Sequence, residues 1–163
     1  ARWYWPTWMP LSPACARPCD PMTYPLPDSV IDAVIEATRF TDDGLVPAIA
    51  QQHDSGEILM MAWMNRDSIR ETLRSGRACY WSRSRQSFWR KGDSSGQVQN
   101  LVELRVDCDG DTLLLLVDQL GVACHTGRRS CFYRAARPEG LTVTAPVLMS
   151  PDALYGTKGG SSF

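Results

Sequence analysis

Hydrophobic and polar positions follow a helical period in two stretches of the chain and an extended pattern in most of the rest. Apolar residues recur every three or four positions at residues 29–40 and 66–75, which predicts two short helices. Short apolar runs and two-residue alternation predict strands at residues 45–51, 57–64, 80–85, 98–108, 112–117 and 131–135. This succession predicts an α+β fold, in which a mainly antiparallel, twisted sheet is accompanied by a few short helices.

Local turn and cap signals define the ends of several of these elements. Asn65 and Gly76 are expected to cap helix 66–75 at its start and its end, and Ser29 is expected to cap helix 29–40. Asp-Gly at residues 109–110 lies between two apolar runs and predicts a hairpin, because it is a strong turn signal. His53 lies in the turn predicted between the first two strands, where a solvated histidine is the simplest interpretation.

Composition divides the chain into three parts. Residues 1–27 are rich in proline and tryptophan, which excludes a regular helix or a central strand and predicts an extended arm. Residues 28–137 hold the predicted elements and form the expected domain. Residues 138–163 end in KGGSSF and are expected to form a peripheral C-terminal tail.

Charge and hydropathy narrow the class of protein. A net charge of -1 over 163 residues gives no general attraction to nucleic acid or to an anionic membrane, so any anion binding has to be local. The longest apolar run, residues 58–64, is far shorter than the roughly 20 residues that span a bilayer. Prolines also interrupt the N-terminal stretch where a signal peptide would need an unbroken apolar segment. We therefore expect a cytoplasmic protein without a membrane span.

Residues 78–96, ACYWSRSRQSFWRKGDSSG, interleave basic and aromatic side chains. If strand 80–85 is regular, Trp81, Arg83 and Arg85 share one face, and one interpretation is an ordinary amphipathic strand with a solvated basic face. Residues 91–96 combine a lysine with small residues that expose backbone N–H groups and hydroxyls, which suits a phosphate group. Arginine side chains nearby would add bidentate contacts to that phosphate.

Residues 106–132, VDCDGDTLLLLVDQLGVACHTGRRSCF, gather side chains that bind metals and move protons. Along an extended strand Cys108 would face away from Asp107 and Asp109, so a single ion could not easily bind all of them. Thiolates prefer zinc-like ions, whereas carboxylates prefer magnesium or calcium. We therefore predict a thiolate site and a carboxylate site back to back. The alternative is that Asp109 serves only the Asp-Gly turn and that Asp107 and Asp111 are solvated.

Three cysteines, Cys108, Cys124 and Cys131, are spaced as Cys-x15-Cys-x6-Cys, without the Cys-x2-Cys pairs of common structural zinc sites. Three thiolate ligands would leave a fourth position for water, as catalytic zinc sites do. His125 follows Cys124 in a predicted tight Cys-His-Thr-Gly turn and is the candidate for moving a proton of that water. The alternatives for His125 are a fourth zinc ligand or a hydrogen-bond partner of a ligand. Cys79 is expected to be a small buried residue.

Several ordered motifs together resemble those of the phosphoribosyl-AMP cyclohydrolases of histidine biosynthesis. They are SRSR at residues 82–85, W-x-KG-x-SSG at 89–96, DCDGD at 107–111, ACHTG at 123–127 and SCF at 130–132. The resemblance runs from about Leu45 to Phe132 and includes LVPAI and ILMMAWMN. The departures are mild, since Trp63 stands where the family usually has Tyr, Asp93 where Glu is common and Ser94 where Thr is common.

This resemblance implies a zinc enzyme that also requires magnesium and that opens the adenine ring of 1-(5-phosphoribosyl)-AMP by hydrolysing its N1–C6 bond. Water activated by zinc would add to C6 while His125 moves the proton. The implied metal ligands are Cys108, Cys124 and Cys131 for zinc, and Asp107, Asp109 and Asp111 for magnesium close to a phosphate. The residues expected to bind the phosphorylated substrate are Arg83, Arg85, Trp89, Lys91, Ser94, Ser95 and Gly96. The family also forms intertwined homodimers with zinc ligands from both chains, so the same is expected here.

Two other classes of protein share part of this chemistry. A zinc nucleobase deaminase would also activate water, but its His-x-Glu and Pro-Cys-x-x-Cys signature is missing from this sequence. A zinc-containing module that binds nucleic acid without catalysis would use the basic and aromatic stretch. The net charge of -1 argues against that module.

Overall fold

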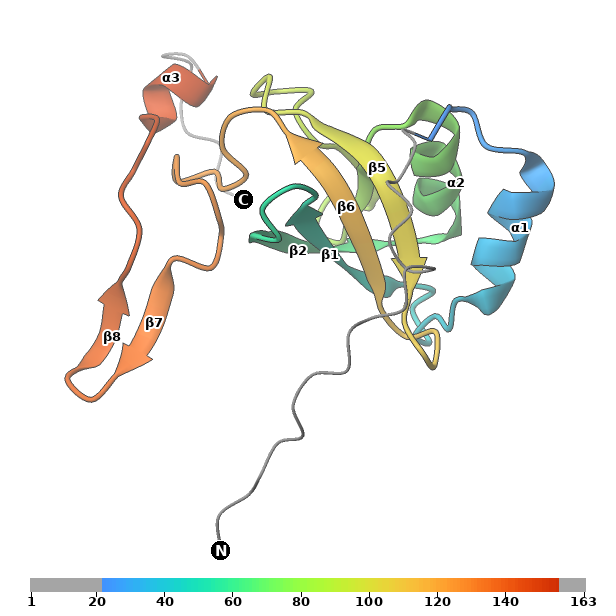
Figure 1. Ribbon diagram of the computed structural model, residues 1–163, viewed down its shortest axis with the longest axis horizontal. Helices are drawn as coiled ribbons and strands as arrows, with labels where there is room; N and C mark the ends of the chain where they lie inside the picture. Colours follow the sequence, from blue (N-terminus) through green and yellow to red (C-terminus); the bar gives the residue numbers. More distant parts are fainter. Residues whose placement is uncertain (1–21, 156–163) are drawn as a thin grey trace, which may run out of the picture.

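The structure, a computed structural model, describes residues 22–155. Its elements in chain order are α1 (Asp28–Ala37), β1 (Val46–Gln52), β2 (Ile58–Met64), α2 (Arg66–Ser75), β3 (Cys79–Ser82), β4 (Ser87–Arg90), β5 (Gln99–Val106), β6 (Leu113–Gln119), β7 (Arg134–Arg137), β8 (Gly140–Val143) and α3 (Pro151–Tyr155). Strands β1 to β6 form one curled sheet, and β7 and β8 form a separate hairpin (Figure 1). The predicted α+β fold is confirmed.

The larger sheet has the strand order β4-β3-β2-β1-β6-β5. Its neighbouring strands are antiparallel except for β1 and β6, which run parallel with Ala48 opposite Leu113. The sheet is therefore mainly antiparallel, as predicted, but mixed. The turn before β6 and the segment after β6 lie at opposite ends of this strand, because the strand runs from one to the other.

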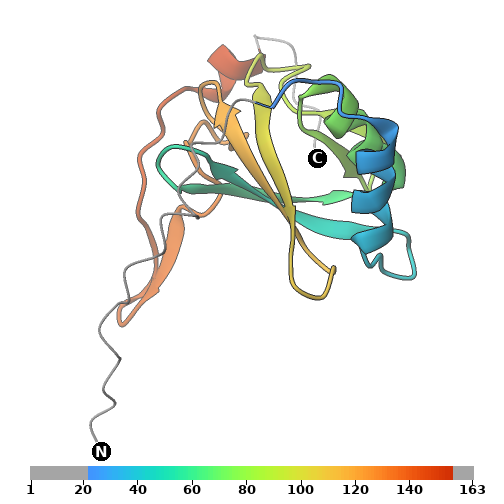
Figure 2. The same ribbon diagram turned by 45° about the vertical axis from the view of Figure 1, so that its right-hand side comes forward.

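One face of the sheet forms the core with α1 and α2, which both lie on that side (Figure 1 and Figure 2). Successive side chains of a strand point to opposite faces, so alternate residues are buried, such as Ala48 in β1 and Leu115 in β6. The other face is also largely apolar but is only partly covered. Its half-buried or exposed side chains include Pro47, Ile49, Met61, Leu114 and Leu116.

Helix α2 begins and ends at the residues that the sequence predicts. The Asn65 side chain accepts a hydrogen bond from the Ser68 N–H at 2.8 Å, and the Ser68 hydroxyl accepts one from the Asn65 N–H at 2.8 Å. This reciprocal pair is a capping box, which satisfies two backbone donors of the first turn. Gly76 ends the helix with φ of 70°, a left-handed conformation that favours glycine.

Helix α1 differs from its prediction at both ends. It begins at Asp28, before the expected cap Ser29, and the residue in the cap position is Pro27, whose side chain makes no capping hydrogen bond. The Asp28 carboxylate lies in the first turn, where the positive end of the helix dipole stabilises it. The helix stops at Ala37, and the Arg39 N–H then donates to a carbonyl of the β5–β6 turn.

Two strands differ from prediction in ways that change which side chains meet. Strand β3 ends at Ser82 and residues 83–86 form the turn to β4, so the prediction of one strand face shared by Trp81, Arg83 and Arg85 is wrong. In β5 the register with β6 shifts next to Val102, which is the extra residue of a bulge. Leu101 before the bulge is buried, whereas Val102 is half-buried.

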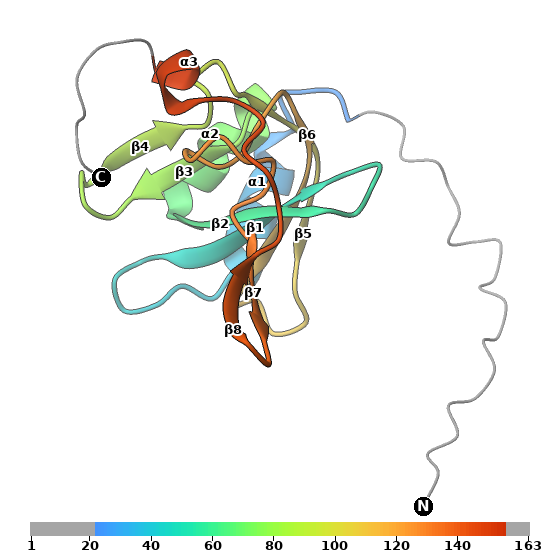
Figure 3. The ribbon, with the colours of Figure 1, turned by 90° about the vertical axis from the view of Figure 1, so that its left-hand side faces the viewer.

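The segment after the sheet carries more regular structure than the sequence predicts. The last strand was predicted at residues 131–135. Its predicted start is wrong, because β7 begins at Arg134. Strand β7 pairs with β8, which lies beyond Pro138, and the hairpin extends away from the sheet (Figure 3). Helix α3 follows, and its Leu154 is buried.

The predicted arm comprises residues 1–27, of which residues 1–21 lie outside the described part of the chain. Its last part contributes to the core, because Tyr24 and Leu26 pack against buried residues and the Leu26 N–H donates to the Leu73 carbonyl at 3.1 Å. Among residues 22–155 the structure contains no helix with the length and apolar character of a membrane span.

Candidate active site

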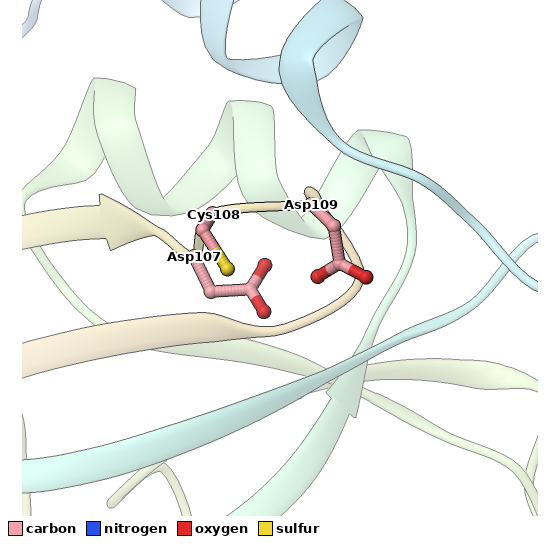
Figure 4. Close-up of side chains that lie close together, drawn as sticks. All are labelled: Asp107, Cys108 and Asp109. Atoms are coloured by element: carbon pink, nitrogen blue, oxygen red, sulfur yellow. The ribbon is translucent and has the colours of Figure 1, made fainter.

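The turn between β5 and β6, residues 107–112, brings three candidate ligands together, and we call it the aspartate turn. One carboxylate oxygen each of Asp107 and Asp109 and the Sγ of Cys108 all lie within 4.8 Å of one another. Figure 4 shows these three side chains close together on the turn. All three residues are exposed, so solvent or a second molecule can reach them.

A glycine and an arginine hold the aspartate turn against the end of α1. Gly110 has φ of 80°, and a Cβ at this position would collide with the Ala37 carbonyl oxygen. Arg39 follows that helix, and its Nη2 donates to the Asp109 carbonyl oxygen at 2.8 Å. The shape of the turn therefore depends on glycine at residue 110 and on contact with a helix that is distant in sequence.

Hydrogen bonds favour the ionised form of Asp107. Desolvation acts to raise the pKa of this carboxyl, but the Thr112 N–H, at 3.1 Å, and the side chains of Asp109 and Asp111 outweigh it, so the pKa is lowered. Asp111 accepts a further hydrogen bond from the Thr112 hydroxyl at 3.0 Å. Ionised carboxylates this close repel one another, and a divalent cation would relieve that repulsion.

The prediction that the Cys108 side chain faces away from Asp107 and Asp109 is wrong. Strand β5 ends at Val106, so the following residues no longer alternate as in a strand. The Cys108 thiol lies with the carboxylates of Asp107 and Asp109 rather than opposite them. Within one chain, the soft thiol of Cys108 and the hard carboxylates of Asp107 and Asp109 therefore lie in the same cluster.

Cys124 and Cys131 lie in residues 121–131, after the end of β6, and we call this segment the cysteine loop. The Gly127 N–H donates to the Cys124 carbonyl at 3.0 Å, which confirms the predicted tight Cys-His-Thr-Gly turn. The Cys131 N–H donates to the Leu59 carbonyl at 2.7 Å, so the end of the loop is fixed at the start of β2. The two thiols are neighbours, and both are free.

The two neighbouring thiols suit a soft metal ion. Part of Cys131 reaches solvent, yet burial of its thiol raises its pKa to about 12, and the neighbouring Cys124 contributes in the same direction. A metal ion that binds here therefore displaces a proton. Paired sulfur donors without a disulfide are the set that zinc-like ions prefer.

Arg129 anchors the cysteine loop to the ends of β1 and β6. Its Nη1 donates to the carbonyl oxygens of Gln119 at 3.1 Å and Gly121 at 2.7 Å. Its Nη2 donates to the Gln52 side-chain oxygen at 2.9 Å, across 77 positions of sequence. Its Nε also pairs with the Glu57 carboxylate at 3.4 Å. The loop is thus fixed by contacts with two strands and with the β1–β2 turn.

Lys91 lies against the cysteine loop. The residue is 7% exposed, and its Nζ donates to the Ala123 carbonyl at 2.7 Å. Burial lowers the pKa of Lys91, while the neighbouring Cys131 and Cys124 act in the opposite direction. The structure therefore places this amine beside the two thiols, and the phosphate contact expected of Lys91 stays a prediction.

The small residues after Lys91 border the start of the cysteine loop. The Ser95 hydroxyl accepts a hydrogen bond from the Gln97 N–H at 3.3 Å, and the Gln97 side-chain oxygen accepts one from the Val122 N–H at 2.9 Å. Ser94 and Gly96 lie in the same turn. These residues are linked through Gln97 to the start of the cysteine loop, and their role in phosphate binding stays a prediction.

The arginines of the SRSR motif lie at the far end of the β3–β4 hairpin from Lys91. The Arg83 guanidinium lies over the Trp63 ring, 5.0 Å from its centroid, and the Arg85 Nε donates to the Ser82 hydroxyl at 3.2 Å. Trp89 lies closer to Lys91, in β4, with its ring centroid 5.6 Å from the Lys91 Nζ. The basic residues expected to bind substrate therefore form two groups rather than one.

His125 is exposed in the tight turn directly after Cys124. The C-terminal segment packs on the same turn, because the N–H groups of Leu148 and Met149 donate to the Gly127 carbonyl at 2.8 Å and 3.1 Å. Burial and then the neighbouring Cys124 raise the pKa of Tyr155. Residues beyond 138 thus contribute to the surroundings of His125, which the sequence does not indicate.

Within one chain, Cys108 cannot bind the same ion as Cys124 and Cys131. Cys108 precedes β6 and Cys124 follows it, and the 7 residues of β6 span about 23 Å at about 3.3 Å per residue. Zinc–sulfur bonds are about 2.3 Å long, so thiolates on one zinc ion lie within about 4 Å of one another. One chain therefore offers two thiols at one end of the sheet and the third at the other end.

Sequence reasoning missed Arg39 and Arg129. Arg129 could have been found, because it lies between two candidate ligand cysteines in the stretch CHTGRRSC. Arg39 carries no such signal, because its contact with Asp109 joins residues 70 positions apart.

Comparison with known proteins points to a single family. Residues 60–133 match the family model described as phosphoribosyl-AMP cyclohydrolase. A protein of Rhodospirillum rubrum with that name is 66% identical over 130 residues, which cover 79% of this chain and 91% of the relative. One of Paramagnetospirillum magneticum is 67% identical over 129 residues, covering 78% and 98%. One of Halorhodospira halophila is 58% identical over 141 residues, covering 86% and 94%.

Proposed function

Because the chain belongs to the phosphoribosyl-AMP cyclohydrolase family, we propose that it hydrolyses the N1–C6 bond of the adenine ring in 1-(5-phosphoribosyl)-AMP. The product is the ring-opened formimino-aminoimidazole-carboxamide ribotide of histidine biosynthesis. The observation that carries the proposal is the identity of 66% over 79% of the chain. The aligned relatives bear the name of this activity, and the side chains in the site can supply its chemistry.

The two clusters fit different metal ions. The free thiols of Cys124 and Cys131 suit zinc, and the carboxylates of the aspartate turn suit magnesium. When bound by thiolates with one position open, zinc supplies a Lewis acid that makes water a better nucleophile near neutral pH. We assign zinc to Cys124, Cys131 and Cys108, and magnesium to Asp107, Asp109 and Asp111.

His125 is proposed to move the proton in this reaction. It is exposed and adjacent to Cys124, so it lies beside the proposed zinc position and can be reached by a substrate. Addition of water to C6 releases a proton, and cleavage of the N1–C6 bond requires a proton on N1. The imidazole of a histidine can accept the first proton and donate the second.

A second copy of the chain is proposed to complete the zinc site. Cys108 lies at the opposite end of β6 from Cys124 and Cys131, so a three-thiolate site requires Cys108 from another chain. The partly covered apolar face of the sheet, with Met61 46% exposed, and the 62% exposed Phe132 beside Cys131 support such a contact. The homodimer would also bring the carboxylates of one aspartate turn close to the thiol pair of the other chain.

The activity is tested by incubating the protein, loaded with zinc and magnesium, with 1-(5-phosphoribosyl)-AMP. Opening of the purine changes its ultraviolet absorbance, so turnover can be followed directly. We expect turnover that is abolished by a zinc chelator and restored by zinc. A folded, metal-loaded protein that leaves the substrate intact would overturn the proposal.

The shared site is tested by complementation between inactive variants. Cys108→Ser and Cys124→Ser are co-expressed with different tags, and the mixed dimer is purified through both tags. If each zinc site uses both chains, the mixed dimer contains one intact site and should recover about half the activity of the wild-type dimer. The control pair, Cys124→Ser with Cys131→Ser, should stay inactive, because both losses affect the same group of ligands. Absence of recovery in the first pair would contradict a shared site.

A further inference from the structure

A chain of hydrogen bonds leads from one candidate zinc ligand to the C-terminal part of the protein. The Thr126 hydroxyl oxygen lies 3.0 Å from the Cys124 Sγ, and the Arg128 Nη1 donates to the same oxygen at 3.1 Å. The Arg128 Nε donates in turn to the Ala145 carbonyl at 3.1 Å. We call Thr126 and Arg128 the threonine–arginine pair. Sequence reasoning assigned no role to either residue.

The direction of the hydrogen bond between Thr126 and Cys124 follows from what each group can donate. A threonine hydroxyl has one proton and two lone pairs, and a guanidinium group can only donate. The Arg128 Nη1 therefore occupies a lone pair of the Thr126 oxygen and leaves its proton free for the sulfur. A metal-bound cysteine is a thiolate and can only accept. With an ion in place, the hydroxyl is thus the donor to the Cys124 sulfur.

The Arg128 guanidinium is held in one orientation and keeps its charge available. It lies over the Tyr133 ring, with its carbon 4.2 Å from the ring centroid, in addition to its two hydrogen bonds. Among residues 22–155 it forms no ion pair with a carboxylate. A charged donor polarises the hydroxyl that it binds, so the bond from that hydroxyl to the sulfur becomes stronger.

Residues 144–155, which we call the C-terminal strap, fix the surroundings of the threonine–arginine pair. The Thr144 N–H donates to the Tyr133 carbonyl at 2.8 Å, so the strap begins beside the ring that the arginine covers. Further along, the strap packs on the turn that carries the threonine. Gly127 has φ of 76°, and a Cβ at this position would collide with the Met149 carbonyl oxygen. The turn and the strap are therefore in close contact.

A hydrogen bond to sulfur has a specific consequence at a site built from thiolates. Three thiolates bring more negative charge than a divalent ion carries, which weakens the ion as a Lewis acid. A hydroxyl that donates to one sulfur withdraws electron density from it and offsets part of this effect. Partners that orient a metal ligand typically change metal affinity or activity by about 10–100-fold.

We infer that Thr126 is a positioning residue for the metal ligand Cys124, that its hydroxyl donates a hydrogen bond to the metal-bound sulfur, and that Arg128 acts through this hydroxyl. The zinc assignment rests on the proposed function, whereas the hydrogen bonds follow from the side chains themselves. The C-terminal strap lies outside residues 60–133, which match the family model, and acts on the metal site through Arg128.

The role of the hydroxyl is tested by measuring the Kd for Zn²⁺ in competition with a chromophoric chelator. Thr126→Val has nearly the same volume but lacks the hydroxyl, so its Kd should rise by about tenfold or more. Thr126→Ser keeps the hydroxyl and should bind Zn²⁺ like the wild type. Equal affinity in Thr126→Val and the wild type would overturn the inference, and so would an equal loss in Thr126→Ser and Thr126→Val.

Cobalt substitution reports on the sulfur itself. Co²⁺ held by thiolates has a sulfur-to-metal charge-transfer band, whose energy depends on how strongly the sulfur holds its electrons. A hydrogen bond lowers the energy of these electrons, so its loss in Thr126→Val should move the band to longer wavelength. A side chain that only supports the loop would change the amount of bound Co²⁺ and leave the band in place. An unmoved band in Thr126→Val is therefore a result against the inference.

The part played by Arg128 is tested in a double-mutant cycle with Thr126. Arg128→Met removes the donor, so the hydroxyl loses its orientation, and the Kd for Zn²⁺ should rise by less than in Thr126→Val. In the Thr126→Val background the same change should add nothing, because no hydroxyl is left to orient. Equal effects of Arg128→Met in both backgrounds would show that Arg128 does not act through Thr126, contrary to the inference.

Thr142→Val is the matched control, because the Thr142 hydroxyl donates to the Ala135 carbonyl at 3.3 Å within the β7–β8 hairpin. It should match the wild type in the Kd for Zn²⁺ and in the cobalt band. The unfolding temperature of each metal-free variant is measured alongside. An unchanged value in Thr126→Val assigns its loss of affinity to the metal site, whereas the same loss in Thr142→Val would overturn the inference.

These measurements need no turnover, so they separate the inference from the proposed function. A wild type that shows the cobalt band and the expected shift in Thr126→Val, but leaves the purine intact, would support the threonine–arginine pair while the proposed function fails. Turnover by the wild type, with no change in affinity or band in Thr126→Val, would overturn the inference while the proposed function stands. A wild type without a thiolate-to-cobalt band would overturn the zinc assignment and the inference together.

Discussion

The aspartate turn and the cysteine loop lie at opposite ends of β6 and are held in place by different means. The aspartate turn depends on Gly110, on backbone hydrogen bonds and on Arg39, whose side chain is 67% exposed. The cysteine loop depends on Arg129, whose side chain is 30% exposed and which bonds to the ends of two strands. The aspartate turn is therefore held by its own backbone and by the end of α1, and the cysteine loop by the packed body of the protein.

The contacts under the cysteine loop continue into the core. The Gln52 side-chain oxygen, which accepts a hydrogen bond from Arg129, also accepts one from the Gln119 N–H at 3.0 Å. The Gln119 side-chain oxygen accepts from Gln99 at 2.8 Å, and the Tyr80 hydroxyl donates to Gln99 at 2.7 Å. Polar networks of this kind are rigid when every member has a partner. The difference matches the ligands proposed for each cluster, because two of the three zinc thiolates come from the cysteine loop and need fixed positions, whereas magnesium on the aspartate turn keeps waters that can adjust.

The largest expected effect concerns chemistry at the cysteine loop. His125→Ala should lower kcat by about 10²–10⁴, the usual contribution of a general acid or base, and should leave one zinc ion per site. Turnover and zinc content by atomic absorption are measured on the same preparation. Loss of zinc along with activity would make His125 a ligand and would remove it from the role of proton carrier.

The second effect concerns the support of the cysteine loop. Arg129→Ala removes one hydrogen-bond donor from each of the oxygens of Gln52, Gln119 and Gly121, so the free energy of unfolding should fall by about 2–4 kcal/mol. Urea denaturation measures this change. Arg129→Lys keeps the charge and part of the contacts, and its loss should be smaller. Equal stability of Arg129→Ala and wild type would contradict the view that the core holds the loop.

The elements with local signals were predictable from sequence. The cap residues Asn65 and Gly76 define both ends of α2, and the Asp-Gly pair marks the turn between β5 and β6. The bulge at Val102 has no such signal, because it arises from the pairing of β5 with β6, and it changes the phase of the alternation. The parallel pairing of β1 with β6 is likewise set by packing between segments far apart in the chain.

The types of side chain in the site were predictable, but their grouping was not. The sequence indicates Cys124, Cys131 and His125 by their spacing, and the tight turn that carries them is confirmed. The orientation of Cys108 was predicted wrongly, because strand parity no longer applies once β5 has ended. The position of Lys91 beside the thiols depends on its bond to Ala123, a contact across 32 positions that composition cannot indicate.

The third effect separates the two metals. Asp109→Asn replaces a proposed magnesium ligand with a neutral amide, so the magnesium concentration for half-maximal activity should rise by about tenfold or more, while zinc content is unchanged. Asp118→Asn is the matched control, because Asp118 lies in β6 outside the turn. This variant should respond to magnesium as the wild type does. An unchanged magnesium response in Asp109→Asn would remove this residue from the cation site.

The smallest effect tests how much the Arg39 side chain contributes to holding the aspartate turn. Arg39→Gln removes the bond to the Asp109 carbonyl and the 4.0 Å ion pair with its carboxylate, both of them exposed. Exposed pairs contribute little, so the free energy of unfolding should fall by no more than about 1 kcal/mol, less than for Arg129→Ala. Both variants are measured by urea denaturation under the same conditions. If Arg39→Gln proved as destabilising as Arg129→Ala, the aspartate turn would depend on the rest of the fold as strongly as the cysteine loop does, because Gly110 and the backbone hydrogen bonds would not suffice to shape it.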